Sequence, residues 1–383
     1  MKNLIRNVIL KPTYSTFSSA LLFGTALMCN ASVAADKELP LGDLKLPAGF
    51  KVEVIARVPN ARGMTISPEG TLYVGTKSDG KVYAVKFESG WKNAKVHAIA
   101  KGFDEPVGVA LNKGDLYFSA VSKIYKISGV EKTLENPPKP TLVTDKFPDK
   151  SHHGWKFIAF GPDGKLYVPI GAPCNVCDEK DFSNIMRMNT DGTGIERFAS
   201  GVRNTVGFDW SPKTSELWFT ENGRDMMGDD IPGDELNHAP RAGLHFGFPY
   251  CHAGSVLDPE FGKEKKCDDY AKPAVTLGAH VAALGMRFYR GKTFPAKYSG
   301  QVFVAEHGSW NRRKKSGYRV MMATVKDNKI NSYEPFLEGF LKNEKAWGRP
   351  VDVENAADGS LLVSDDEAGA IYRVFYEAAV AVR

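Results

Sequence analysis

The chain has 383 residues, with 50 Lys and Arg against 45 Asp and Glu, so its formal net charge is +5. A balance this close to neutrality, with a single basic run at 312–315, excludes a protein that binds nucleic acid through a concentrated basic surface. The length suffices for one large all-β domain or for two smaller domains.

The N-terminal segment has the pattern of an export signal. Basic residues but no acidic residue precede Asp36, and an apolar stretch at 19–28 is too short to span a bilayer. Val33 and Ala35 suit the −3 and −1 positions of a signal-peptidase site. We therefore predict a cleaved signal peptide at 1–35, a periplasmic protein, and a single mature domain at 36–383.

Two other interpretations of this segment are an N-terminal membrane anchor and a lipoprotein attached through Cys29. The residues before Cys29 fit a lipid-attachment box poorly, so we favour cleavage and expect no stable membrane insertion.

Four cysteines remain after the signal peptide: Cys174, Cys177, Cys251 and Cys267. An even number in an oxidising compartment favours disulfides, and 174–177 with 251–267 is the most local of the three possible pairings. Covalent haem is excluded because Asp178 stands where a c-type haem motif needs histidine. A four-cysteine zinc site would require the two pairs to meet in space, and 251/267 is not a tight knuckle.

A short sequence pattern recurs along the chain: an apolar strand, a tight turn that usually holds Pro, Asp or Gly, and a second strand rich in aromatic and β-branched residues. Its six copies are 63–74, 107–118, 157–168, 206–219, 286–304 and 351–363. Third and fourth strands follow several copies, so each copy predicts one four-stranded antiparallel blade. We therefore predict an all-β, six-bladed β-propeller.

The two ends of the repeat predict how the ring closes. The sixth copy reaches the end of its third strand near Phe375, while an unattached strand at 51–56 precedes the first copy. Pairing the two completes the last blade and removes an exposed sheet edge. A β-sandwich would explain neither the sixfold period nor the extra strand.

In a propeller the first strand of each blade lines the central axis, so the residues just before these strands surround one mouth of it. Charged, imidazole and amide side chains occupy those positions: Arg62, Glu105, His152, His153, Lys156, Arg203, Asn204, His280 and Arg349. Taken singly, each is more simply a loop residue, but their convergence predicts a binding site for a polyanionic ligand, with imidazole available for proton transfer.

Two further loops lie near this mouth. The fourth copy is followed by 221–237, whose glycines, carboxylates and free carbonyls suit an oxygen-seeking ion such as Ca²⁺, although a solvated acidic loop has the same composition. The fifth is followed by a turn with Trp310, which would stack on a ring or a sugar, or else cover the blade edge.

At these residues the chain resembles the soluble quinoprotein glucose dehydrogenase and sorbosone dehydrogenase family, over roughly 46–376. The segments that carry the resemblance are 152–156, 161–167, 201–204, 233–237 and 307–312. The stretch 172–177 makes the sorbosone branch the more similar one.

The resemblance implies an enzyme that transfers hydride from its substrate to pyrroloquinoline quinone (PQQ), with Ca²⁺ bridging to the cofactor. A histidine before the third blade would be the general base, and His152 and His153 both remain candidates. Arg203 would also act in catalysis by polarising the quinone. Backbone carbonyls of Gly223 and Arg224 would bind Ca²⁺.

The cofactor would be held by side chains from several blades. Arg203 and Asn204 would contact the quinone oxygens, Arg349 would pair with a carboxylate, and Arg312 or a neighbour would replace a cofactor-binding lysine. We also assign His280 and Trp310 to cofactor binding.

The chain departs from the glucose dehydrogenases at three positions. Ala172 stands where they carry an acid that helps to hold the base and substrate, and Val351 replaces a second arginine. Arg224 replaces a proline, which changes no ligand atom. The missing acid puts glucose in doubt as the substrate.

We therefore expect a PQQ- and Ca²⁺-dependent oxidoreductase acting on a sugar, a sorbosone-like sugar aldehyde or an aldose, with a periplasmic cytochrome or quinone as electron acceptor. The alternatives are a calcium-dependent sugar lactonase of propeller fold, which would need carboxylates on the axis, and a non-catalytic periplasmic binding propeller.

Overall fold

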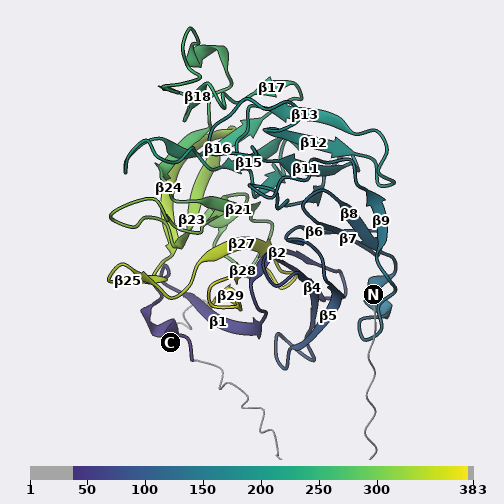
Figure 1. The fold of residues 1–383 in the computed structure, drawn as a ribbon. Helices are drawn as coiled ribbons and strands as arrows, with labels where there is room; N and C mark the ends of the chain where they lie inside the picture. Colours follow the sequence, from purple (N-terminus) through teal and green to yellow (C-terminus); the bar gives the residue numbers. More distant parts are fainter. Residues whose placement is uncertain (1–37, 378–383) are drawn as a thin grey trace, which may run out of the picture. The chain divides into compact units, whose positions relative to one another are not determined.

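The structure is a computed structural model that describes residues 38–377, and the predicted signal peptide lies outside them. Within this range the chain forms a six-bladed β-propeller, as the repeat predicts (Figure 1). No α-helix occurs in the described residues, only four 3₁₀ turns: η1 (Leu41–Asp43), η2 (Val130–Lys132), η3 (Cys267–Asp269) and η4 (Ala296–Tyr298). None of the described helical segments has the length and apolar character needed to cross a bilayer.

The first three blades follow in chain order, each from its inner to its outer strand. Blade 1 is β2 (Ala61–Ile66), β3 (Leu72–Thr76), β4 (Lys81–Lys86) and β5 (Lys95–Lys101). Blade 2 is β6 (Val109–Asn112), β7 (Asp115–Ser119), β8 (Ile124–Ile127) and β9 (Thr141–Thr144). Blade 3 is β10 (Ala159–Phe160), β11 (Leu166–Ile170), β12 (Asn184–Met188) and β13 (Glu196–Ser200).

The remaining blades complete the ring. Blade 4 is β14 (Phe208–Trp210), β15 (Leu217–Glu221), β16 (Gly233–Ala239) and β20 (Val275–Ala279). Blade 5 is β21 (Ala283–Phe288), β22 (Val302–Glu306), β23 (Arg319–Lys326) and β24 (Lys329–Leu337). Blade 6 is β27 (Pro350–Asn355), β28 (Leu361–Asp365), β29 (Ala370–Tyr376) and, as its outer strand, β1 (Phe50–Arg57).

A long excursion between β16 and β20 departs from the simple four-stranded pattern. Its strand β17 (Leu244–His245) pairs in parallel with β13 and gives blade 3 a fifth strand. The excursion also holds the hairpin of β18 (Cys251–His252) and β19 (Val256–Leu257). A second small hairpin, β25 (Leu341–Lys342) with β26 (Lys345–Ala346), precedes blade 6.

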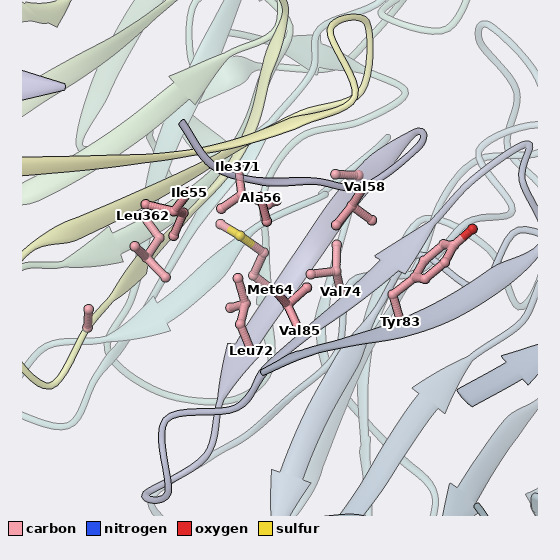
Figure 2. Close-up of a cluster of buried hydrophobic side chains, with 12 residues drawn as sticks. Ile55, Ala56, Val58, Met64, Leu72, Val74, Tyr83, Val85, Leu362 and Ile371 are labelled. Atoms are coloured by element: carbon pink, nitrogen blue, oxygen red, sulfur yellow. The ribbon is translucent and has the colours of Figure 1, made fainter. Parts of the chain in front are cut away.

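The predicted closure of the ring is confirmed. Strand β1 pairs antiparallel with β29 from Phe50–Tyr376 to Arg57–Ala370. Apolar side chains of β1 and blade 6 then pack against those of blade 1, as Figure 2 shows for Ile55, Ala56, Leu362 and Ile371 beside Met64, Leu72, Val74 and Val85. The N-terminal strand therefore joins the last blade to the first.

Glycines allow the inner strands to approach one another around the axis. A methyl group on Gly63 would collide with the carbonyl of Val107 in the next blade, and one on Gly108 with that of Lys156. Gly207 and Gly285 repeat this relation between blades 4 and 5 and between blades 5 and 6. Backbones in such close contact hold the residues that precede the inner strands in a narrow ring.

The cysteines pair as the most local arrangement predicts, Cys174 with Cys177 and Cys251 with Cys267. The first disulfide closes a short loop after β11, and the second ties the β18–β19 hairpin to η3.

Candidate active site

A cavity of about 330 Å³ opens at the mouth where the inner strands begin. Eight of the predicted residues line it together: Arg62, His153, Arg203, Asn204, Gly223, His280, Trp310 and Arg349. Trp310 lies at its edge with 69% of its surface exposed. The expected convergence on the axis is therefore present in the folded chain.

The other predicted side chains lie near the cavity without lining it. Glu105 is 3.6 Å from Lys77, an ion pair that connects it to the wall. Lys156 is buried and donates from Nζ to the Gly154 carbonyl at 2.7 Å. Arg312 reaches outward to Asp230 at 3.0 Å, and His152 is exposed.

A second group of cavity residues, which lies outside the predicted ring, follows the second strand in three of the blades. They include Lys77 after β3, Asn222 after β15 and His307 after β22. In an antiparallel pair, the end of the second strand lies beside the start of the first, so these positions share the same mouth. The sequence repeat therefore also marks the positions after the second strands as candidates for the cavity wall.

His153 is held as a hydrogen-bond acceptor facing the cavity. Its Nδ1 lies 2.8 Å from the carbonyl oxygen of Ala172, so Nδ1 carries the proton and Nε2 keeps a free lone pair. Burial lowers the pKa of His153 well below its usual range, and the positive charge of Arg203 lowers it further. The imidazole is therefore neutral at neutral pH. The backbone carbonyl of Ala172 thus orients the ring of His153.

The backbone at this mouth adopts a conformation that side chains normally avoid. His153 has φ 48°, Glu105 φ 45° and His280 φ 59°, all in the left-handed region. Each costs on the order of 1–3 kcal/mol and persists only where the surrounding structure imposes it. Strain at the same place in three blades is typical of a functional site.

Arg203 uses every guanidinium N–H on protein acceptors. Nε and Nη2 donate to Asn175, Nη1 donates to the carbonyls of Asn222 and Gly223, and Nη2 also donates to Asp225. These five bonds exhaust its donors. Arg203 therefore gives the cavity a buried positive charge in a fixed position.

Arg62 lies in a buried chain of charged groups. Its Nη1 is 2.6 Å from Asp366, whose other oxygen is 2.8 Å from Nε2 of His307. Burial lowers the pKa of His307 to about 4 despite Asp366, so this imidazole is neutral at neutral pH. The Nε of Arg62 and the indole N–H of Trp155 are buried donors without a partner.

Arg349 differs from these arginines because no carboxylate in residues 38–377 lies within 4.0 Å of its guanidinium. It donates to the carbonyls of His307 at 3.1 Å and Gly308 at 2.8 Å, and it lies 5.5 Å from the Tyr318 ring centroid. Its positive charge is therefore available to an anionic ligand.

One wall of the cavity is rich in oxygen. It includes Gly223, Asp225 and Asp234. Asp234 accepts from the Gly223 N–H at 2.9 Å and from the Ala283 N–H at 3.3 Å, and burial raises its pKa to about 6. Within the described range, no three His, Cys, Asp or Glu side chains are arranged to hold a metal, so a cation here would depend on backbone carbonyls.

A larger cavity of about 440 Å³ opens at the other end of the axis. Its arginines are matched by acids: Arg287 lies 3.4 Å from Asp352 and 3.3 Å from Glu354, and Arg290 lies 2.6 Å from Asp209. The mouth around Arg349 is therefore the better candidate for binding an anion.

Comparison with known proteins agrees with this architecture. An uncharacterized protein of Borreliella burgdorferi is 35% identical over 370 residues, which cover 92% of this chain and 96% of that protein. The chain is also similar in fold to a Trichoderma reesei carbohydrate-active enzyme of family AA12 in its calcium structure (TM-score 0.77, 17% identity, 90% and 100% of the two chains). The holo form of the PQQ domain of Coprinopsis cinerea pyranose dehydrogenase is similar as well (TM-score 0.71, 17% identity, 87% and 97%). The family model described as TrAA12-like matches residues 44–377, and the chain therefore belongs to the TrAA12-like family.

Proposed function

We propose that this protein is an oxidoreductase that uses PQQ and Ca²⁺ to oxidise a sugar or a sugar aldehyde. The observation that carries the proposal is the cavity itself, in which Arg349 meets no carboxylate of residues 38–377, Arg62 has an unpaired buried donor, and the neutral His153 lines the wall. Two fold neighbours, a holo PQQ domain of a pyranose dehydrogenase and a family AA12 enzyme in a calcium structure, support it.

The residues fit PQQ, a planar group with three carboxylates. Arg349 would pair with one carboxylate, and the unpaired Nε of Arg62 is a donor for another acceptor. Asn204 and His280 would contact the polar edge of the ring, and the exposed Trp310 would cover its face. Arg312 would contribute charge from the rim.

The residues also fit Ca²⁺, which prefers oxygen ligands. The carbonyl of Arg224 would hold the ion together with that of Gly223, which also accepts from Nη1 of Arg203 at 2.9 Å. Arg224 is itself fixed, because its guanidinium pairs with the buried Asp258 of the β18–β19 hairpin. The lactonase alternative loses support here, because Asp225 is committed to Arg203 and Asp234 to two backbone N–H groups.

PQQ, when bound, supplies a quinone that accepts hydride. A substrate C–H releases hydride only if the neighbouring hydroxyl, or the hydrate of an aldehyde, gives up its proton. The free Nε2 of His153 would take that proton, and Ala172 holds the ring in the tautomer that can do so. The fixed charge of Arg203 would stabilise negative charge that develops beside it.

The exact substrate, the export route, the location and the electron acceptor belong to the same proposal. The sorbosone-like aldehyde is our proposed substrate because the stretch 172–177 resembles the sorbosone branch, and Ala172 puts glucose in doubt. We also propose export by the signal peptide at 1–35, a periplasmic location, and a cytochrome or quinone as electron acceptor. The two disulfides support an oxidising compartment.

The direct test is reconstitution of the cofactor. Protein produced in a host that lacks PQQ is expected to be inactive, and to gain dye-linked oxidation of sugars or aldehydes only when PQQ and Ca²⁺ are both added. Calorimetric titration with PQQ in the presence of Ca²⁺ should show saturable binding. Absence of that binding would overturn the proposal and favour a non-catalytic propeller.

Arg349→Ala is expected to weaken PQQ binding about 30-fold, or ~2 kcal/mol, because a charge-assisted pair is lost. The kcat at saturating PQQ should change little, since Arg349 addresses the cofactor. The matched control is Arg241→Ala, at an exposed position remote from the cavity lining. Equal affinity in the two variants would remove Arg349 from the cofactor site.

A further inference from the structure

The loop closed by the Cys174–Cys177 disulfide contacts Arg203, a residue of the cavity wall, through Asn175. The Asn175 carbonyl accepts from Nε of Arg203 at 2.8 Å, and its Oδ1 accepts from Nη2 of Arg203 at 2.9 Å. Asn175 therefore takes two of the five guanidinium donors and fixes both the position and the plane of the group.

The same asparagine also binds the acid that pairs with Arg203. Its Oδ1 accepts from the Asp225 N–H at 2.8 Å, and its Nδ2 donates to the Asp225 carbonyl at 3.0 Å. Asp225 in turn lies 3.0 Å from Nη2 of Arg203. Asn175, Arg203 and Asp225 form a closed hydrogen-bonded unit, although Asn175 is 28 and 50 residues distant from the other two in the sequence.

The disulfide is suited to holding this unit in place. Its cysteines are only three positions apart. Closing so short a loop removes less conformational entropy from the unfolded chain than closing a long one. The loop lies outside the strands and 3₁₀ turns, so no strand ladder orders it. The disulfide therefore acts chiefly on local geometry, where it keeps both acceptors of Asn175 directed at the guanidinium.

We infer that Asn175, whose loop is held by the Cys174–Cys177 disulfide, is a positioning residue that fixes the location of the Arg203 guanidinium in the active site. The inference rests on the proposed function, because that function gives Arg203 its catalytic use. Without the Asn175 side chain, one donor of a guanidinium that is 3% exposed loses its acceptor, and the group must move to find another, while the backbone carbonyl at this position remains.

Displacement of Arg203 has a second, measurable consequence at His153. The charged or titratable groups that act on this imidazole are Arg203, His152 and Lys77, and its Nδ1 is bound to the Ala172 carbonyl. Arg203 is the largest of the charge effects that lower its pKa. If Arg203 moves away, the pKa of His153 rises, and activity that needs the neutral imidazole is lost at a higher pH than before.

The experiment compares Asn175→Ala with Asn175→Asp, which keeps an acceptor for Arg203, and with Val176→Ala, in the same loop. Asn175→Ala is expected to lower kcat about 10²-fold, the effect of misplacing a reacting group by about 1 Å. The acidic limb of its kcat/KM profile should move to higher pH. Asn175→Asp should recover part of the rate, and Val176→Ala should match the wild type. The Cys174→Ser/Cys177→Ser double variant should shift in the same direction as Asn175→Ala.

A readout without cofactor separates this inference from the proposed function. NMR titration of the His153 ring in apo-protein should show a higher pKa in Asn175→Ala than in the wild type. Wild-type protein that fails to bind PQQ would contradict the function but leave this measurement valid. A wild-type His153 pKa in folded Asn175→Ala, or an equal loss of rate in Val176→Ala, would overturn the positioning role. If Asn175→Ala fails to fold, the double cysteine variant decides the question by the same titration.

Discussion

His153→Ala is expected to lower turnover of the PQQ- and Ca²⁺-loaded enzyme by about 10²–10⁴-fold, the usual contribution of a general base. The reason is geometric: Nδ1 is bound to the Ala172 carbonyl, so Nε2 is the only free base atom that this ring offers to the cavity. PQQ affinity measured by calorimetry should change little, because the ring addresses the substrate.

The neighbouring histidine provides the matched control. His152 is exposed and does not line the cavity, while its ring centroid lies only 4.1 Å from that of His153. His152→Ala should therefore retain most of the turnover. A larger loss in His152→Ala than in His153→Ala would reverse the assignment of the base.

The pH dependence of the wild type follows from the same geometry. The base works when it is neutral, so activity is present above the pKa of His153 and is lost as the pH falls through it. Burial and Arg203 lower that pKa well below its usual range. The acidic limb of the wild-type profile should therefore lie clearly below the pH expected for a free histidine, which is about 6.5.

Removal of the N-terminal strand is expected to abolish stable folding. Without residues 36–56, blade 6 loses most of β1, and β29 is left with an unpaired edge. The apolar contact between blade 6 and blade 1 also loses Ile55 and Ala56 (Figure 2). Unpaired edges and exposed apolar surface both favour aggregation. Size-exclusion chromatography should show aggregates, and thermal unfolding should lack the cooperative transition of the wild type.

A point substitution tests the packing of β1 on its other side, against blade 5 and β29. Phe50 of β1 makes edge-to-face contacts with Phe294, Tyr298, Phe336 and Tyr376, at centroid distances of 4.7–5.1 Å. Phe50→Ala should cost about 3–5 kcal/mol of the free energy of unfolding. Leu142→Ala, at a half-exposed position in blade 2, should cost well under ~1 kcal/mol. A soluble truncation with unchanged melting would refute the closure argument.

The sequence by itself determined the propeller, its closure and the ring of site residues. Strand alternation and turn residues are local properties, and six copies of one pattern leave little choice of architecture. The positions before the inner strands follow from the repeat, so Arg62, His153, Arg203 and Arg349 could be placed at one mouth. The even number of cysteines predicted disulfides, and the structure shows which of the three possible pairings forms, the most local one.

Only the tertiary structure decided which of these side chains keep a free hydrogen-bonding atom or an unpaired charge. Adjacent histidines look alike in the sequence, but a bond from His153 to Ala172, 19 residues away, separates them. Similar arginines differ because Arg203 is saturated by Asn175, Asp225 and two carbonyls, whereas Arg349 meets no acid within the described residues. Partners of this kind come from loops of different blades, and their distances depend on how those blades pack, which no local pattern encodes.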